Sequence, residues 1–153
     1  MEKLDQTDRK LLQLLQQNSR LTIKELAAQL HLTTTPVFER IKRLEKNGII
    51  DKYIVLLDRE KIGKSLTIFL QVSLQEHQRG ALDEFVEQVI QFEEVMECYH
   101  ISGDSDFMLK IITENMETYN EFVLQKLSLI PHIGKVRSQF ALSCRKYTTA
   151  MKI

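Results

Sequence analysis

The spacing of apolar residues changes once along this chain, and the change divides the sequence into two differently built parts. Up to Gly48 the apolar side chains recur at the three- and four-residue spacing of helices, as in Ile23, Leu26 and Leu30. Beyond Ile50 the period falls to two in several segments, which is typical of strands. The sequence therefore predicts an N-terminal part made of helices and an α+β C-terminal part.

The N-terminal part is expected to contain three helices. Asp5 can cap the first helix. Thr22, followed by Glu25, forms a capping box that predicts the start of the second. The third begins after a turn of about three residues, with Pro36 in its first turn, and ends near Gly48. A turn this short between two helices is typical of a helix-turn-helix.

The C-terminal part is expected to alternate strands and helices. Asn115 can cap the second of its helices, and Pro131 closes that helix. The expected strands are residues 50–57, 66–74, 95–102, 107–113 and 136–143, and the first helix is residues 80–91. From residue 66 onward this order is βαββαβ, a ferredoxin-like antiparallel sheet covered by two helices. Apolar residues on the opposite sheet face (Phe69, Tyr99 and Ile101) predict a second subunit there.

Composition limits the functional classes. The net charge is zero, but residues 1–63 carry 12 Lys and Arg against 9 Asp and Glu, a net charge of +3, while residues 64–153 carry 9 against 12, a net charge of −3. A basic N-terminal part suits a nucleic-acid module. Cys98 and Cys144 make no disulfide framework, and we find neither a signal peptide nor an apolar run long enough for a membrane span. We expect a cytoplasmic protein.

The third helix has an outward face that suits DNA. Thr35, Glu39, Lys42, Arg43 and Lys46 recur at helical spacing opposite the apolar stripe. Lys and Arg bind phosphates or guanine edges, and Glu can accept a hydrogen bond from cytosine. A charged, solvated helix face with an i,i+4 Glu39–Arg43 pair remains the alternative.

The sequence resembles the Lrp/AsnC family, the leucine-responsive and asparagine-responsive feast/famine regulators. The resemblance covers essentially the whole chain. It is carried by Leu4-Asp5 with Asp8, by TTTPVFERIKRLEKNGII at residues 33–50, and by ECYHISGDSDFMLK at residues 97–110. It implies a winged helix-turn-helix domain at residues 1–50, a β linker at 51–63, and a domain for dimerisation and amino-acid sensing at 64–153. It departs from many members at His31, where they have Gly; His tolerates positive φ better than most residues.

The resemblance implies a transcription regulator that binds double-stranded DNA as a homodimer assembling to an octamer. Its assembly and DNA binding are expected to respond to an amino-acid effector. The residues expected to contact DNA are Thr33, Thr34, Thr35, Glu39, Arg40, Lys42, Arg43 and Lys46.

The turn between the second and third strands of the βαββαβ order is the expected effector site. As a pattern alone it is an ordinary polar hairpin, since Gly and Asp are common turn residues. The resemblance instead implies an amino-acid pocket at an interface between dimers. Ser105 stands where the family usually has an aromatic residue. The residues expected to line the pocket are His100, Gly103, Asp104, Ser105 and Asp106.

Enzymatic and metal functions have little support in the sequence. Cys98 and His100 share a strand face, but no second Cys-His pair and no oxyanion hole accompany them. We expect no enzyme, no metal and no cofactor. Two alternatives stay open: a ligand-binding or enzymatic βαββαβ protein with a vestigial helical part, and a protein of assembly only.

Overall fold

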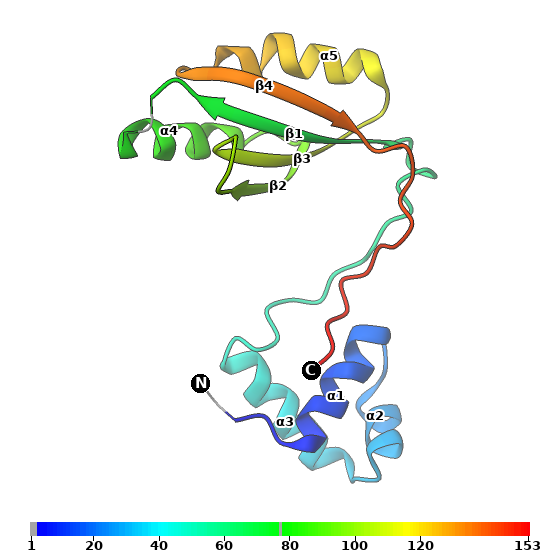
Figure 1. The fold of residues 1–153 in the computed structure, drawn as a ribbon. Coiled ribbons are helices and arrows are strands. Elements are labelled where there is room, and N and C mark those ends of the chain that lie inside the picture. The colour runs from blue at the N-terminus through cyan, green and yellow to red at the C-terminus, as the bar shows by residue number, and fades with distance from the viewer. Residues whose placement is uncertain (1–2, 77) are drawn as a thin grey trace. The chain divides into compact units, whose positions relative to one another are not determined.

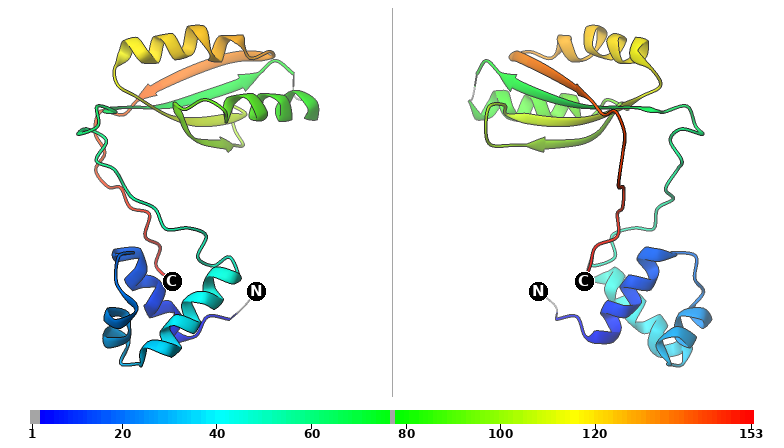
Figure 2. Two further views of the ribbon diagram at one scale, coloured as in Figure 1. Left: turned by 180° about the vertical axis from the view of Figure 1, so that it is seen from behind. Right: turned by 45° about the vertical axis from the view of Figure 1, so that its right-hand side comes forward.

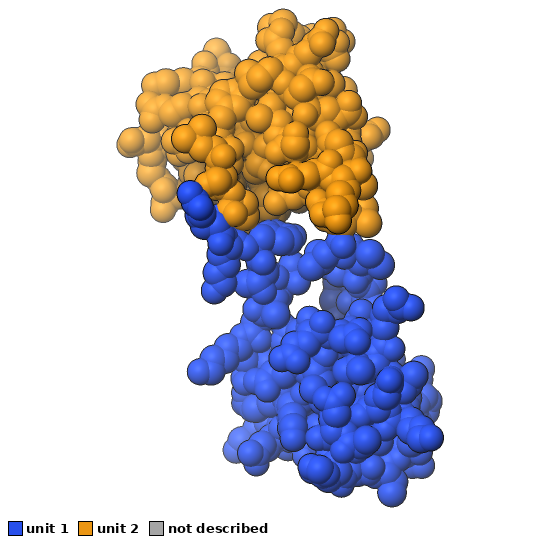
Figure 3. Space-filling model, turned by 90° about the vertical axis from the view of Figure 1, so that its right-hand side faces the viewer, with its two compact units in different colours: residues 1–56, 145–153 blue, residues 57–144 orange. Residues whose placement is uncertain are grey.

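The computed structural model describes residues 3–76 and 78–153. The chain forms two compact units, which Figure 3 shows in two colours. The helical unit contains residues 1–56 together with 145–153, and the sheet unit contains residues 57–144. Each unit has its own apolar core. Within the described residues, no helix combines the length and apolar character needed to cross a membrane.

The helical unit contains the three expected helices: α1 (Gln6–Gln17), α2 (Ile23–Leu30) and α3 (Thr34–Lys46), labelled in Figure 1. The capping box is confirmed. The Thr22 amide donates to Glu25 Oε2 at 2.7 Å, and the Glu25 amide donates to Thr22 Oγ1 at 3.2 Å. The hydrogen bond from the Thr22 backbone lowers the pKa of the Glu25 carboxyl. These bonds satisfy donors that a helix start leaves without intrahelical partners.

In the turn between α2 and α3, histidine occupies a position that requires the left-handed backbone conformation. His31 has φ 54°, and its neighbour Leu32 donates its amide to the Ala27 carbonyl at 3.0 Å. This bond closes α2 and directs the chain into α3. Gly48, at φ 67°, ends α3 in the same left-handed region, as its position predicts.

The core of the helical unit also receives residues from the C-terminal end of the sequence. Its buried residues are Leu11, Leu12, Leu26, Ala27, Val37, Ile41 and Leu44. Residues 145–153, which we call the return segment, belong to this unit, and Ile153 packs against its core. Met151 pairs with Gln16 of α1: its amide donates to Gln16 Oε1 at 2.7 Å, and its carbonyl accepts from Gln16 Nε2 at 3.0 Å. The predicted domain division had assigned the return segment to the C-terminal domain.

The sheet unit has the predicted βαββαβ order. Its antiparallel sheet has the strand order β2-β3-β1-β4, and α4 and α5 cover one face of it (Figure 2). The elements are β1 (Leu66–Leu74), α4 (Arg79–Val89), β2 (Val95–His100), β3 (Phe107–Thr113), α5 (Met116–Gln125), the 3-10 turn η1 (Leu127–Leu129) and β4 (Ile133–Phe140).

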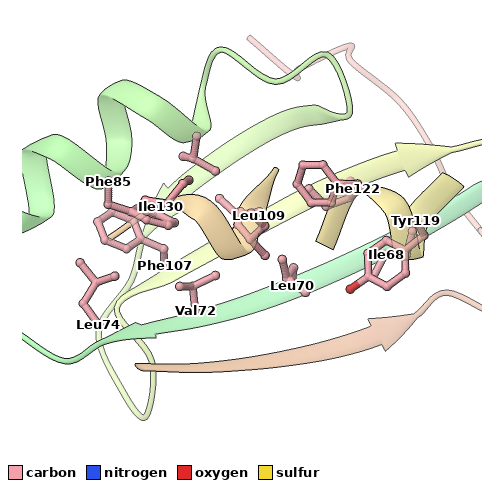
Figure 4. Packing of buried hydrophobic residues seen from close by; sticks show 13 residues of the cluster. Ile68, Leu70, Val72, Leu74, Phe85, Phe107, Leu109, Tyr119, Phe122 and Ile130 are labelled. Atoms are coloured by element: carbon pink, nitrogen blue, oxygen red, sulfur yellow. The ribbon is translucent and has the colours of Figure 1, made fainter. Parts of the chain in front are cut away.

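The core of the sheet unit lies between this face and the two helices (Figure 4). Leu70 and Leu109, opposite each other on β1 and β3, are fully buried. Phe85 of α4 and Phe122 of α5 pack on the same core. Inward residues alternate with outward ones along both strands, which is why a two-residue period predicted them correctly.

Three predicted strands need correction, and the one expected at residues 95–102 ends at His100. Residues 50–57 form no strand, and their side chains from Tyr53 onward are mostly exposed, with Val55 82% exposed. This apolar segment has no strand to pair with in the described chain. The last strand is Ile133–Phe140 instead of residues 136–143, and it begins earlier because pairing with Leu74 continues past a register shift at the end of β1.

The face of the sheet opposite the helices carries both apolar and charged groups. Phe69 and Tyr99 are 37% and 52% exposed. Glu97 accepts hydrogen bonds from Lys110 Nζ at 2.6 Å and from the Tyr99 hydroxyl at 2.8 Å. The Lys110 ammonium lowers the pKa of the Glu97 carboxyl. A partner subunit on this face stays a prediction.

Candidate DNA interface and effector turn

Helix α3 presents its N-terminus and one polar face to solvent. Thr33 is its N-cap, but its side chain makes no capping hydrogen bond. Thr34 and Thr35 are also exposed. A helix start with amide groups and hydroxyls facing solvent suits a DNA phosphate, because the helix dipole favours an anion there. Glu39 is exposed farther along the same helix.

Two lysines supply positive charge along this face. Lys42 Nζ lies 3.9 Å from Glu45 Oε2 and 5.6 Å from the centre of the Phe38 ring. Lys46 is exposed in the last turn of α3. Phe38 is 45% exposed, although it belongs to a helix whose other large apolar residues are buried. The sequence interpretation had not included Phe38 in the DNA surface.

The two arginines of α3 bind carboxylates of α1. Arg40 Nη1 lies 2.6 Å from Asp5 Oδ2 and 2.6 Å from Asp8 Oδ1, and Arg43 Nη2 lies 2.6 Å from Asp8 Oδ2. The Arg43 side chain is 42% exposed, whereas that of Asp8 is 2% exposed. The expectation that Arg43 belongs only to the outward face of α3 was incomplete, because its long side chain also reaches back to α1.

This ion-pair network reinforces the start of α1. The Asp8 amide donates to Asp5 Oδ1 at 2.7 Å, and the Asp5 amide donates to Asp8 Oδ2 at 3.2 Å, which together form a capping box. The Asp8 amide, followed by Arg40, lowers the pKa of the Asp5 carboxyl. Asp5 and Asp8 in turn raise the pKa of the Arg40 guanidinium. Asp5 and Arg40 are therefore both charged at neutral pH.

The turn between β2 and β3 is held in place by bonds to β1. Asp106 accepts the Leu74 amide on its carboxylate at 2.8 Å, and its own amide donates to the Val72 carbonyl at 3.0 Å. Ser73 Oγ donates to the Asp104 carbonyl at 3.3 Å. Gly103 has φ 134°, a conformation that favours glycine. The turn is thus tied to the neighbouring strand, a feature that a hairpin pattern alone does not predict.

A pocket of about 180 Å³ lies beside this turn. It joins the turn to the open sheet face, since Ser73 is paired with Lys135 and Gln71 with Arg137 across β1 and β4. Its lining residues are Gln71, Ser73, Asp104, Ser105, Lys135 and Arg137. The sequence analysis did not include Lys135 and Arg137 of β4 in this site, because no local sequence pattern connects them with the turn.

The other predicted effector residues do not line this pocket. The His100 ring stacks on Phe107, with 5.0 Å between the ring centres. The Asp106 carboxylate binds the Leu74 amide as described, and Gly103 shapes the turn. The structure therefore brings Asp104 and Ser105 together with Lys135 and Arg137.

Cys98 does not have the properties of a nucleophile. It is half-buried, and burial raises the pKa of its thiol, which disfavours the thiolate. Within residues 3–76 and 78–153, no group of three or more His, Cys, Asp and Glu side chains is placed to hold a metal ion.

Comparisons with known proteins match both parts of the chain. A family model described as Winged helix-turn-helix DNA-binding matches residues 4–51, and one described as Lrp/AsnC ligand binding domain matches residues 67–151. The chain is 39% identical over 150 residues to the DNA-binding transcriptional activator DecR of Escherichia coli, covering 98% of this chain and 99% of that protein.

Two further proteins that this chain resembles are also transcription regulators. The leucine-responsive regulatory protein of Escherichia coli is 31% identical over 150 residues, covering 98% of this chain and 92% of that protein. The crystal structure of the transcriptional regulator NMB0573 from Neisseria meningitidis in complex with L-Met is similar in fold. It has a TM-score of 0.92 and 34% identity, covering 97% of this chain and 96% of that chain.

Proposed function

Because this chain belongs to the Lrp/AsnC family of DNA-binding transcription regulators, we propose that it binds its operators through α3 and responds to a free amino acid at the turn between β2 and β3. It is a transcription regulator and not an enzyme. The observation that carries the effector proposal is the pocket where Asp104 of the turn meets Lys135 and Arg137 of β4.

The proposed DNA surface combines phosphate contacts with base contacts. Thr33, Thr34 and Thr35, at the start of α3, hold a phosphate against the helix N-terminus. Lys42 and Lys46 are exposed and can bind phosphates along the groove. The predicted contacts of Glu39, Arg40 and Arg43 remain part of this proposal.

The effector pocket suits a zwitterion. An amino acid carries an α-carboxylate and an α-ammonium group close together. The guanidinium of Arg137 and the ammonium of Lys135 can bind the carboxylate, and the Asp104 carboxylate can bind the ammonium. Ser105, a small residue, leaves room for the effector's own side chain. The L-Met bound to the similar Neisseria regulator supports an amino acid as the class of ligand.

We include assembly in the proposal. Phe69 and Tyr99 are exposed on the open sheet face, and residues 53–57 form a continuous exposed apolar segment. Both features suit pairing with another copy of the chain, because strand edges and apolar faces gain free energy when covered. A homodimer that assembles further, as far as an octamer, presents several DNA-binding helices to one duplex.

The test measures amino-acid binding and DNA binding separately. Each of the 20 amino acids is screened by thermal shift, and a hit is measured by calorimetry and by sizing with and without ligand. Arg137→Met should lower the affinity for that amino acid by roughly 10- to 150-fold, because a charge-assisted hydrogen bond contributes about 1.5–3 kcal/mol. DNA affinity in the absence of ligand should be unchanged.

The matched control is Arg79→Met, which removes the same group from a side chain that is 96% exposed on α4. It should leave ligand affinity unchanged. Equal ligand affinity in Arg137→Met and wild type would remove Arg137 from the pocket. Absence of salt-dependent binding to the gene's upstream DNA would contradict the regulatory function itself and favour a protein of assembly only.

A further inference from the structure

The effector pocket contains more positive charge than the α-carboxylate of one amino acid needs. Lys135 and Arg137 belong to β4, and Asp104 belongs to the turn between β2 and β3. These are the charged residues among the six that line the pocket, and two cations against one carboxylate give a formal charge of +1. A zwitterion with an uncharged side chain carries one carboxylate and one ammonium group, so it leaves one of the two cations without a partner.

The charged groups of the pocket are not neutralised within the sheet unit. Elsewhere in that unit Lys64 lies 3.2 Å from a glutamate oxygen, and Lys126 lies 2.6 Å from another. In residues 3–76 and 78–153, by contrast, Lys135 and Arg137 are exposed and have no carboxylate within ion-pair distance. Because two neighbouring like charges repel each other, an occupant with two negative charges removes an unfavourable interaction.

The order of the charged groups along the pocket follows from strand pairing. Residues two apart on a strand share one face and lie about 7 Å apart. Lys135 is paired with Ser73 and Arg137 with Gln71, which places both cations on the open sheet face. Ser73 Oγ also donates to the Asp104 carbonyl at 3.3 Å. Lys135 is therefore beside the turn that carries Asp104, and Arg137 is one two-residue step farther from that turn.

We propose that the effector is an acidic amino acid, aspartate or glutamate, whose side-chain carboxylate binds Arg137. The inference rests on the proposed function, because it takes this pocket as the amino-acid site. The α-ammonium binds the Asp104 carboxylate, and the α-carboxylate, attached to the same carbon atom, binds the adjacent Lys135. The side-chain carboxylate extends along β4 to Arg137, whose planar guanidinium can donate two parallel hydrogen bonds to it.

The uncharged residues of the pocket lining agree with this class of effector. None of the six residues that line the pocket is aliphatic or aromatic. An apolar side chain gains binding free energy mainly by leaving water for contact with apolar groups, and these residues offer little such contact. We therefore expect an effector different from the L-Met bound to the similar Neisseria regulator.

The test is calorimetric titration of the full chain with acid and amide pairs at one ionic strength. L-Glutamate is compared with L-glutamine, and L-aspartate with L-asparagine, because each pair has nearly the same shape and differs by one charge. The acid of at least one pair should bind roughly 10-fold more tightly than its amide. This is the lower end for a hydrogen bond to a charged group, because Arg137 is exposed to solvent.

Two variants assign the two carboxylates of the effector. Arg137→Met should lower the affinity for the acid to that for its amide and leave the affinity for the amide nearly unchanged. Lys135→Met should weaken the acid and the amide by the same factor. The matched control Arg79→Met, at a side chain that is 96% exposed on α4, should alter neither affinity. An acid preference that persists in Arg137→Met would overturn the proposal.

2-Oxoglutarate tests the role of Asp104. This compound has both carboxylates of glutamate but a keto group in place of the ammonium, so it should bind more weakly than glutamate. Equal affinity would show that the pocket does not recognise an ammonium group, and it would contradict both this inference and the proposed amino-acid response.

The remaining outcomes separate the inference from the proposed function. If leucine or methionine binds and neither acid is preferred to its amide, the inference is wrong and the proposed function stands. If no amino acid binds, both fail. If Arg137→Met changes the size of the assembly but not the affinity for the acid, the cation serves a partner subunit, and the inference is again wrong.

Discussion

Leu44→Ala tests whether the two units of this chain unfold separately. Leu44 lies on α3 and is fully buried in the core of the helical unit. The sheet unit has a different core, and the two clusters have no buried residue in common. A cavity at Leu44 should therefore destabilise the DNA-binding helices and leave the effector pocket intact.

The expected magnitude follows from burial. Truncating a fully buried leucine costs about 2–5 kcal/mol, through lost apolar contact and the cavity left behind. The helical unit has about 65 residues. At roughly 0.05–0.15 kcal/mol per residue its whole stability is about 3–10 kcal/mol. The substitution therefore removes a large share of this stability, and a loss of about 3 kcal/mol raises the unfolded fraction of this unit roughly 150-fold.

Hydrogen–deuterium exchange of the full chain, read by mass spectrometry, resolves the two units. Leu44→Ala should speed exchange in peptides from α1 to α3 and leave those from β1 and β3 unchanged. The matched control is Leu109→Ala, a fully buried leucine of β3, which should give the opposite pattern. Equal acceleration of both units by either variant would refute the independence inferred from the separate cores.

Three further outcomes are expected. Gln16→Ala removes both hydrogen bonds to Met151 and should lower the local stability of the return segment by about 1 kcal/mol. Limited proteolysis should therefore cleave the return segment faster, with α1 still helical. An unchanged cleavage rate would contradict this. His31→Gly should raise the free energy of unfolding by up to about 1 kcal/mol, and with it the thermal midpoint, since left-handed backbone is costly for residues other than glycine. A lower midpoint would count against that reasoning. The pKa of Asp5 is lowered by the Asp8 amide and then by Arg40, so the stability that Asp5 contributes is present at neutral pH and is lost as pH falls below about 4. In urea unfolding, Asp5→Asn should reduce the dependence of the unfolding free energy on pH in this acidic range. An unchanged dependence would argue against this role of Asp5.

Local signals in the sequence predicted most of the fold. Thr22 with Glu25 marked the start of α2 because both groups of a capping box lie within one turn. The alternation from Leu66 to Leu74 predicted β1 because its two faces have different surroundings. His31 was correctly expected to tolerate the turn, since a left-handed conformation depends on the residue itself.

Features that depend on distant partners were not predicted. Residues 50–57 contain an apolar run like that of a strand but have no strand partner in the described chain, and a local apolar pattern cannot report on pairing. A helical wheel gives the direction of the Arg43 Cβ, but the bond to Asp8 depends on how α1 packs against α3. Lys135 and Arg137 join the turn pocket through the pairing of β4 with β1, which no local spacing encodes.

The return segment also has a consequence for the order of synthesis. A ribosome delivers residues 1–56 first, then the whole sheet unit, and only afterwards the residues that complete the helical unit. Until then Ile153 is missing from the side of the core that it covers, and Gln16 lacks Met151. The helices that are made before the sheet unit are thus completed only after it, and a nascent chain stalled within the sheet unit carries DNA-binding helices that lack these contacts.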